Sequence, residues 1–195
     1  LSVSGNTRAI LLAERTALNF FSHLSGVATL TSAWVKEMAG TKCQVRDTRK
    51  TTPGMRVLEK YAVRMGGGTN HRMTLSDAAL IKDNHIAAAG GVVAAFSLVR
   101  EKYPSTDIEI EVDNLQQLRE VLPLNPGLVL LDNMSPAQCA EAVALVAGAT
   151  KLEASGGITI ENARAYAEAG VDYIAVGALT HSAPNFDIGL DMRVE

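Results

Sequence analysis

The sequence of 195 residues carries 18 lysines and arginines against 21 aspartates and glutamates, a formal net charge of −3, and 47% of its residues are hydrophobic. This composition excludes a disordered chain, a collagen and a coiled coil, and it is typical of one folded domain with its own core. We expect no membrane span, because the apolar runs are short, and no nucleic-acid partner, because the chain is acidic overall. Cys43 and Cys139 lack the spacing of metal ligands, so we interpret them as small buried residues of a cytoplasmic protein.

Positive charge is concentrated in residues 42–72, which hold eight basic and only two acidic residues. An acidic chain with one basic segment is more typical of a protein that binds a small anion than of one that binds a polynucleotide. Three basic residues recur at helical spacing, and we interpret them as a solvent-exposed helix face: Arg56, Lys60 and Arg64. Other basic residues lie among turn and glycine residues and are candidates for anion binding: Arg49, Lys50 and Arg72.

Helical periodicity opens the chain, first from Leu11 to Leu18 and again from Val27 to Met38. From residue 44 onward, short strand-like runs alternate with helical ones. The runs are QVRDT (44–48), ALIK (79–82), DIEIEV (107–112), LVLL (128–131), KLEA (151–154) and DYIAV (172–176). This repeated βα pattern predicts a parallel sheet, and the spacing of about 22 residues between the later strands favours an α/β barrel over a doubly wound sheet.

Chemically capable side chains follow the predicted strands. The segments are 47–50, 82–85, 111–113, 132–133, 153–157 and 177–181. In a barrel of this kind the carboxyl ends of the strands form the face on which active sites lie. The sequence therefore predicts that these segments converge on one pocket.

One pair of loops predicts a phosphate site. Ser155, Gly156 and Gly157 stand between a strand and a helix, so backbone N–H groups and the helix N-terminus can hold a phosphate. Gly177 at the next strand end would let the same phosphate approach the backbone. A tight turn alone also explains the first loop, but the two loops in tandem favour phosphate binding.

Two carboxylates, Glu111 and Asp132, end adjacent strands and can hold Mg²⁺ or the two hydroxyls of a ribose. Solvated acids are the alternative interpretation of both. The cationic candidates complement them: Arg49, Lys50, His71, Arg72 and Lys82. Because arginine forks bind carboxylates and lysines act as point charges on phosphates, the sequence predicts a ligand with carboxylates at one end and a phosphorylated sugar at the other.

Several motifs in order are specific enough to suggest a family. They are ERTALN (14–19), DTRKTTPG (47–54), EKYAV (59–63), GGGTNHR (66–72), LIKDNH (80–85), LDN (131–133) and EASGGI (153–158). Together they resemble quinolinate phosphoribosyltransferase over nearly the whole chain. The resemblance implies an incomplete, about seven-stranded parallel α/β barrel, with most of an N-terminal α/β sandwich domain missing from this chain. We accordingly expect a helical lead-in at 1–25 that belongs partly to that domain, a catalytic barrel at 26–181, and a segment at 182–195 that returns to the N-terminal domain.

The resemblance also implies a reaction, in which quinolinate and 5-phosphoribosyl 1-diphosphate give nicotinate mononucleotide, diphosphate and CO₂ with Mg²⁺ as cofactor. Lys50, Lys82, Glu111 and Asp132 would be catalytic, with Mg²⁺ on Glu111 and Asp132, directly or through water. The quinolinate site would comprise Arg15, Arg49, His71, Arg72 and Lys82. The phosphoribosyl diphosphate site would comprise Lys50, Glu111, Asp132, Ser155, Gly156, Gly157, Gly177 and His181. Arg15 would reach a neighbouring subunit's site in a homodimer or higher oligomer.

Two other classes of function stay open from the residues. One is a barrel aldolase, in which Lys82 at a strand end would form a Schiff base. The other is a noncatalytic anion-binding module, for which the arginines and the phosphate loops would suffice while Glu111 and Asp132 would have no purpose.

Overall fold

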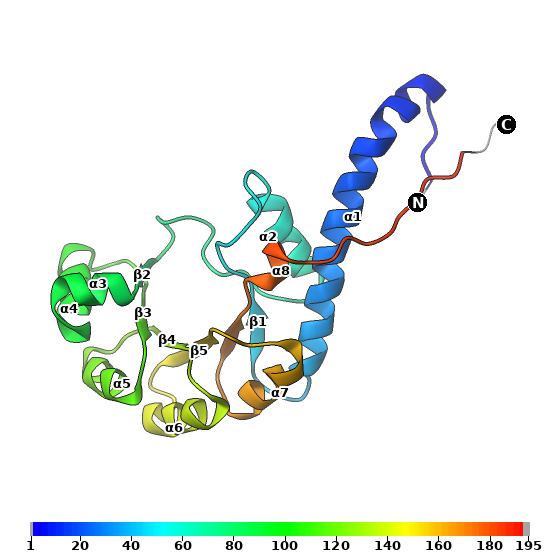
Figure 1. Cartoon of the computed structure of the whole chain (residues 1–195). Helices are drawn as coiled ribbons and strands as arrows, with labels where there is room; N and C mark the ends of the chain where they lie inside the picture. The colour runs from blue at the N-terminus through cyan, green and yellow to red at the C-terminus, as the bar shows by residue number, and fades with distance from the viewer. Residues whose placement is uncertain (1, 193–195) are drawn as a thin grey trace.

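The computed structural model describes residues 2–192, which form a curved parallel sheet covered by helices (Figure 1). The helices are α1 (Thr7–Glu37), α2 (Arg56–Met65), α3 (Asp83–Ala89), α4 (Val92–Lys102), α5 (Leu115–Val121), the 3₁₀ turn η1 (Leu122–Leu124), α6 (Pro136–Val146), α7 (Ile160–Glu168) and α8 (Ala178–His181). The strands are β1 (Gln44–Arg46), β2 (Ala79–Ile81), β3 (Ile108–Val112), β4 (Leu128–Asp132), β5 (Lys151–Ser155) and β6 (Tyr173–Ala175). Each strand lies within one of the six predicted runs or overlaps it closely.

The six strands pair in the order β1-β6-β5-β4-β3-β2, and all neighbours are parallel. The sheet is not closed, since β1 and β2 are its two edges. Beyond β1, a single bridge pairs Arg46 with Thr69, at the place where a seventh strand would lie. The expected incomplete barrel is thus confirmed, with six strands and one bridge among the described residues.

Alternation along β3 explains how the sheet supplies both a core and a site. Ile108, Ile110 and Val112 are buried in the hydrophobic core, with α4 and α5 packed against this strand. Glu109 and Glu111 project from the opposite face into the interior of the curved sheet, where they line cavities. Successive side chains of a strand point to opposite faces, so the pattern IEIEV separates packing from chemistry.

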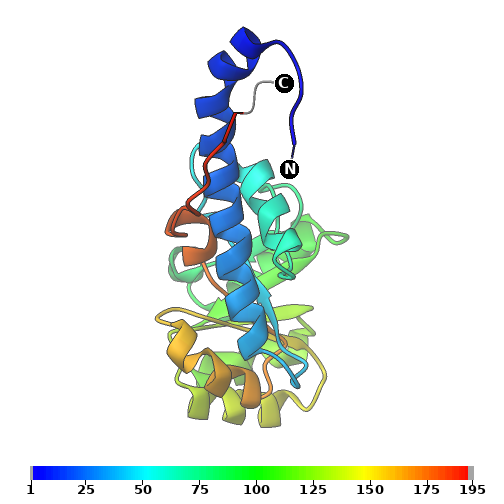
Figure 2. The ribbon, with the colours of Figure 1, turned by 90° about the vertical axis from the view of Figure 1, so that its right-hand side faces the viewer.

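A single helix, α1, replaces the two helical stretches that the periodicity predicts, and it runs without a break through the expected domain boundary at residue 25. Its C-terminal half buries Val27 and Trp34 and packs on α2, α7 and α8. Its N-terminal half extends past the sheet, with the segment after α8 running beside it (Figures 1 and 2). In that segment the Phe186 N–H donates to the Ser22 carbonyl at 2.9 Å. Residues 193–195 of the expected C-terminal segment lie outside the described residues.

Helix α2 corrects one expectation. It ends at Met65, as the glycines after it predict, and Arg64 is solvent-exposed as expected. However, Lys60 is fully buried and Arg56 is half-buried. Lys60 points inward because its ammonium donates hydrogen bonds to the Asp47 carboxylate and the His71 carbonyl. Arg56 donates to the carbonyls of Arg49 and Met73.

Both cysteines are buried free thiols, as expected from their spacing. Burial raises the pKa of Cys43 to about 12 and that of Cys139 to about 11. Within residues 2–192, none of the helices combines the length and the apolar character that crossing a membrane requires.

Candidate active site

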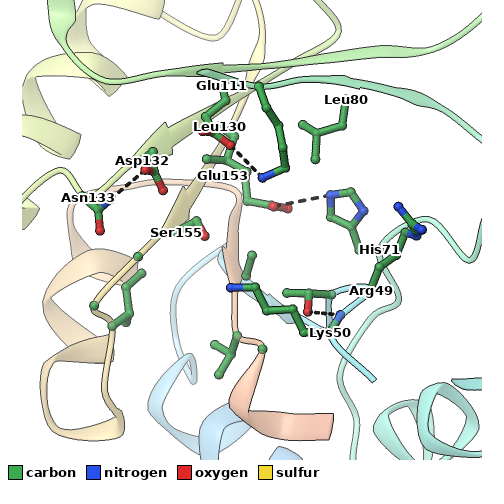
Figure 3. A pocket seen from close by; sticks show the side chains of 18 of the residues that line it. Arg49, Lys50, His71, Leu80, Glu111, Leu130, Asp132, Asn133, Glu153 and Ser155 are labelled. Atoms are coloured by element: carbon green, nitrogen blue, oxygen red, sulfur yellow. Dashed lines mark hydrogen bonds and ion pairs between the residues drawn. The ribbon is translucent and has the colours of Figure 1, made fainter. Parts of the chain in front are cut away.

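A cavity of about 640 Å³ opens at the carboxyl ends of the strands, inside the curve of the sheet (Figure 3). Every predicted site residue except Arg15 lines it: Arg49, Lys50, His71, Arg72, Lys82, Glu111, Asp132, Ser155, Gly156, Gly157, Gly177 and His181. Arg15 is exposed on the N-terminal half of α1, which extends past the sheet. The chain therefore gathers the residues of six strand ends around one cavity but does not bring Arg15 to it.

Two guanidinium groups form the cationic end of the cavity. Arg49 Nε is buried and has no hydrogen-bond partner among the described residues. Arg72 donates from Nη1 to the Ala78 carbonyl at 2.7 Å. Burial, and then the charge of Arg49, lowers the pKa of the Arg72 guanidinium. Two cationic forks held near each other, one with an unused donor, suit an anion that accepts hydrogen bonds through two oxygens, such as a carboxylate.

The His71 ring connects this cationic end to the interior of the barrel. Its Nδ1 accepts the backbone N–H of Arg72 at 2.8 Å, so a neutral ring carries its proton on Nε2. Nε2 lies 2.8 Å from Glu109 Oε2 and 3.6 Å from Glu153 Oε1. The ring thus connects the backbone of Arg72 to the Glu109 carboxylate. With Glu109 and Glu153 it also forms a group of donor atoms close enough together to hold a metal ion.

Carboxylates form the opposite side of the cavity (Figure 3). Oxygens of Glu111, Asp113 and Asp132 lie within 4.8 Å of one another. Burial, and then the nearby Asp113, raises the pKa of Asp132. Lys82 Nζ lies 3.1 Å from Glu111 Oε2. Hard oxygen donors from two adjacent strand ends fit a divalent cation such as Mg²⁺, or the hydroxyls of a sugar.

Glycine residues shape the third side of the cavity. Gly156 and Gly157, between β5 and α7, have φ values of 90° and 62°, which residues other than glycine rarely adopt. A Cβ on Gly156 would lie 2.2 Å from Asn133 Oδ1. A Cβ on Gly177, just before α8, would lie 3.1 Å from both His181 Nε2 and Lys50 Cδ. Both loops therefore present backbone rather than side chain to the cavity.

Comparison with known proteins agrees with this geometry. Residues 27–191 match the family model described as quinolinate phosphoribosyl transferase, C-terminal domain. The chain is 54% identical to the carboxylating nicotinate-nucleotide pyrophosphorylase of Mycobacterium leprae, over 98% of this chain and 69% of that protein. The chain belongs to the quinolinate phosphoribosyltransferase family.

Solved structures of the family have the same fold. The nicotinate-nucleotide pyrophosphorylase of Ehrlichia chaffeensis superposes with a TM-score of 0.90 at 48% identity, over 93% of this chain and 66% of that one. The enzyme of that name from Francisella tularensis also gives a TM-score of 0.90, at 45% identity, over 94% of this chain and 65% of that one. The chain thus spans about two thirds of the length of the proteins it matches.

Two glutamates to which the sequence analysis gave no site role lie on the inner face of the sheet: Glu153 lines this cavity, and Glu109 lines a second cavity that shares His71 and Arg72 with it. Glu153 is fully buried and pairs with Arg46 at 2.8 Å, while the Arg46 guanidinium lies 4.4 Å from the Tyr173 ring centroid. Burial, and then the charge of Glu109, raises the pKa of Glu153 to about 7. The signal was present in the sequence, because each glutamate precedes a strand-end site residue by two positions and so shares its face.

Proposed function

We propose that this protein transfers the phosphoribosyl group of 5-phosphoribosyl 1-diphosphate to quinolinate and releases CO₂, giving nicotinate mononucleotide and diphosphate for NAD biosynthesis. The observation that carries the proposal is the division of one cavity into a cationic end, an acidic side and a glycine-lined side. Quinolinate is a dicarboxylate, and its co-substrate is a phosphorylated sugar, so the two ligands match the two kinds of surface.

In this proposal the quinolinate carboxylates bind at the cationic end. The residues assigned to them are Arg49, His71, Arg72 and Lys82, with Arg15 supplied by a neighbouring subunit. The unpartnered, buried Nε of Arg49 supports the assignment, because a buried donor without an acceptor costs free energy until a ligand satisfies it. Arg72 would bind the carboxylate that is retained in the product.

The phosphorylated sugar binds along the other two sides. Its 5-phosphate would accept hydrogen bonds at the glycine-lined side, from the residues Ser155, Gly156, Gly157, Gly177 and His181. Lys50 lies next to this side, since its Cδ would contact a Cβ on Gly177. Lys50 would therefore face the diphosphate, and Glu111 and Asp132 the ribose hydroxyls.

These positions suit a transfer in which the pyridine nitrogen forms a bond to the anomeric carbon of the ribose as the bond to diphosphate breaks. Positive charge then develops on the sugar and negative charge on the leaving group. Glu111 and Asp132 stabilise the sugar, and Lys50 and Lys82 stabilise the diphosphate. No covalent nucleophile is required from the protein, because the acceptor nitrogen attacks directly.

Decarboxylation follows from the new charge on the ring. The bond from the ring to the carboxylate beside the nitrogen breaks, and CO₂ leaves. The electron pair stays on the ring carbon, where the adjacent pyridinium stabilises it until a proton from solvent is taken up. Arg72 and Arg49 would hold the ring in place through the carboxylate that remains.

We assign Mg²⁺ as the cofactor, held by Glu111 and Asp132 together with Asp113, directly or through water. The three carboxylates fit it because their oxygens lie within 4.8 Å of one another and are the hard ligands that Mg²⁺ prefers. When bound, the ion would add positive charge beside the departing diphosphate.

We further propose a homodimer or higher homo-oligomer in the cytoplasm. Exposed apolar residues on the N-terminal half of α1, Leu11, Leu12, Phe20 and Phe21, support an additional protein contact there. The two buried thiols, without a disulfide, support a reducing compartment.

The two other classes are less well supported. Schiff-base chemistry requires a neutral amine, whereas Lys82 forms an ion pair with Glu111. A simple anion-binding module leaves the cluster of Glu111, Asp113 and Asp132 without a role.

The proposal is tested with the full-length protein, quinolinate, phosphoribosyl diphosphate and Mg²⁺, by following nicotinate mononucleotide and CO₂. Glu111→Gln and Asp132→Asn should each lower turnover by about a hundredfold or more and leave quinolinate affinity nearly unchanged. Glu101→Gln on the exposed surface of α4 is the matched control. Absence of product with the unaltered protein would refute the function, and an equal loss of quinolinate affinity in both variants would refute the roles assigned.

A further inference from the structure

A buried ion pair beneath the cationic end of the cavity has no role in the chemistry described above. Lys60 and Asp47 are both fully buried, and the Lys60 ammonium donates to the Asp47 carboxylate. Burial lowers the pKa of Lys60, and its hydrogen bond with Asp47 opposes that change. Buried ion pairs contribute little stability beyond what an apolar pair of the same volume would give. The free-energy cost of burying these two charges is therefore better explained if they hold another part of the chain in place.

The two charged side chains hold the backbone of His71. Asp47 Oδ1 accepts the backbone N–H of His71 at 2.8 Å, and Lys60 Nζ donates to the backbone carbonyl of the same residue at 2.9 Å. The side chain of Asn70 completes the cluster, since its Nδ2 donates to Asp47 Oδ2 and to the Lys60 carbonyl. One carboxylate and one ammonium thus bind the two consecutive peptide units that flank the Cα of His71.

The side chain of His71 reaches the sheet, because its Nε2 lies 2.8 Å from Glu109 on β3 and 3.6 Å from Glu153 on β5. Residues 70–78 contain no helix or strand, and the loop meets β1 through the single bridge at Thr69. Arg72 follows directly, and its N–H donates to His71 Nδ1. A shift of the His71 backbone would therefore move Arg72, whose guanidinium lines the cavity.

We propose that Lys60 is a positioning residue for the carboxylate-binding end of the cavity, acting with Asp47 to fix the backbone of His71 and, through it, Arg72. This inference rests on the proposed function and adds to it. Lys60 itself does not line the cavity. Its role is to set where the cationic groups stand, so its loss should weaken the dicarboxylate more than the phosphorylated sugar.

The test uses the full-length protein and the double variant Lys60→Met/Asp47→Asn, which removes both charges and so leaves no unpaired ion in the core. Quinolinate affinity, measured by calorimetry, should fall about tenfold or more, while phosphoribosyl diphosphate affinity should change less than about twofold. In steady-state kinetics the KM for quinolinate should rise more than kcat falls. Hydrogen exchange of the amides in residues 69–73 should become faster, whereas exchange in the strands should not.

Two further variants keep the test decisive. Asn70→Ala loosens the same cluster without creating a buried charge, and it should produce a smaller change of the same kind. Arg64→Met, on the exposed side of the same helix, should leave both affinities and the loop exchange unchanged. If the double variant does not fold, Asn70→Ala decides by the same measurements.

The outcomes separate this inference from the proposed function. If the unaltered protein fails to bind quinolinate, the function is refuted, and amide exchange alone then judges the role of Lys60. Unchanged exchange in residues 69–73 overturns the positioning role in either case. Equal losses for both ligands also overturn it, because they would indicate a general structural effect.

Discussion

In the proposed function, Arg72 is the residue that distinguishes carboxylate recognition from phosphate recognition. Arg72→Lys keeps the charge but loses the planar fork, so quinolinate binding should weaken by about 1.5 to 3 kcal/mol, which is roughly tenfold to somewhat more than a hundredfold. Phosphoribosyl diphosphate should bind almost as before. Calorimetric titration of the variant with each ligand separately measures both effects. A larger loss for the phosphorylated sugar would show that the two ends of the cavity are assigned the wrong way round.

Glu153 predicts a pH dependence of stability. Its pKa is raised from 4.5 to about 7 in the folded protein, so between these values the folded state binds more protons than the unfolded state. The contribution of this group to the free energy of unfolding is therefore fully present below about pH 4.5 and declines as pH rises to about 7. Urea unfolding of the protein and of Glu153→Gln across this range should show a smaller decline in the variant. Parallel curves would contradict the assignment.

The residues of the site were predictable to different degrees. Most residues that line the cavity, among them Lys50 and His181, could be predicted from their position just after a strand. This works because a parallel sheet brings the carboxyl ends of all its strands to one edge. The burial of Lys60 could not be read from helical spacing, since its partners, Asp47 and the His71 carbonyl, belong to two other loops. Glu153 could have been placed on the site face from its spacing to Ser155, but its ion pair with Arg46, on a strand distant in sequence, could not be predicted.

Among the elements, the packing of α1 against the C-terminal segment depends on Gly26. A Cβ at this position would lie 2.0 Å from the Pro184 carbonyl oxygen. Gly26→Ala should favour the helix locally by about 1 kcal/mol but displace the segment after α8, with loss of the bond from Phe186 to Ser22. Limited proteolysis should then cleave within residues 183–192 more readily.

Gly127→Ala is the control for this prediction, since nothing lies within 4 Å of its added methyl group. A Gly26→Ala protein that resists proteolysis as well as the unaltered one would show that the segment adjusts to the methyl group without leaving the helix.

The elements of the sheet were easier to predict than the helices. Buried strands such as β3 and β4 have short apolar or alternating runs bounded by polar residues, which are local signals. Helix α3 was not predicted, because its short run of alanines carries little periodicity. Where the resemblance implies a seventh strand, the described residues have only the bridge between Arg46 and Thr69. Whether a strand forms there depends on pairing with β1 and not on the local sequence.

At the scale of the whole molecule, the exposed N-terminal half of α1 predicts shared sites. If Arg15 serves a neighbouring subunit, mixing Arg15→Ala with Lys82→Ala in the full-length protein should recover part of the activity that each variant lacks. A mixed dimer would contain one site with neither substitution, so random exchange should restore up to about a quarter of the sites. Product formation measures the recovery, and subunit exchange is checked by mass spectrometry. No recovery despite exchange would place Arg15 outside the partner's site.

Because β1 pairs with β6, the cavity can be completed only late in translation. Strands β3 to β5 can each pair with the preceding strand soon after they leave the ribosome, but β1 can pair with its neighbour β6 only when residues 173–175 have been made. Thr180, whose hydroxyl donates to the Lys50 carbonyl at 2.7 Å, arrives later still. The basic loop after β1 is thus among the first parts of the cavity to be translated and among the last to be fixed. A nascent chain that stops before β6 would have most of the sheet and still be unable to assemble the cavity around an anion.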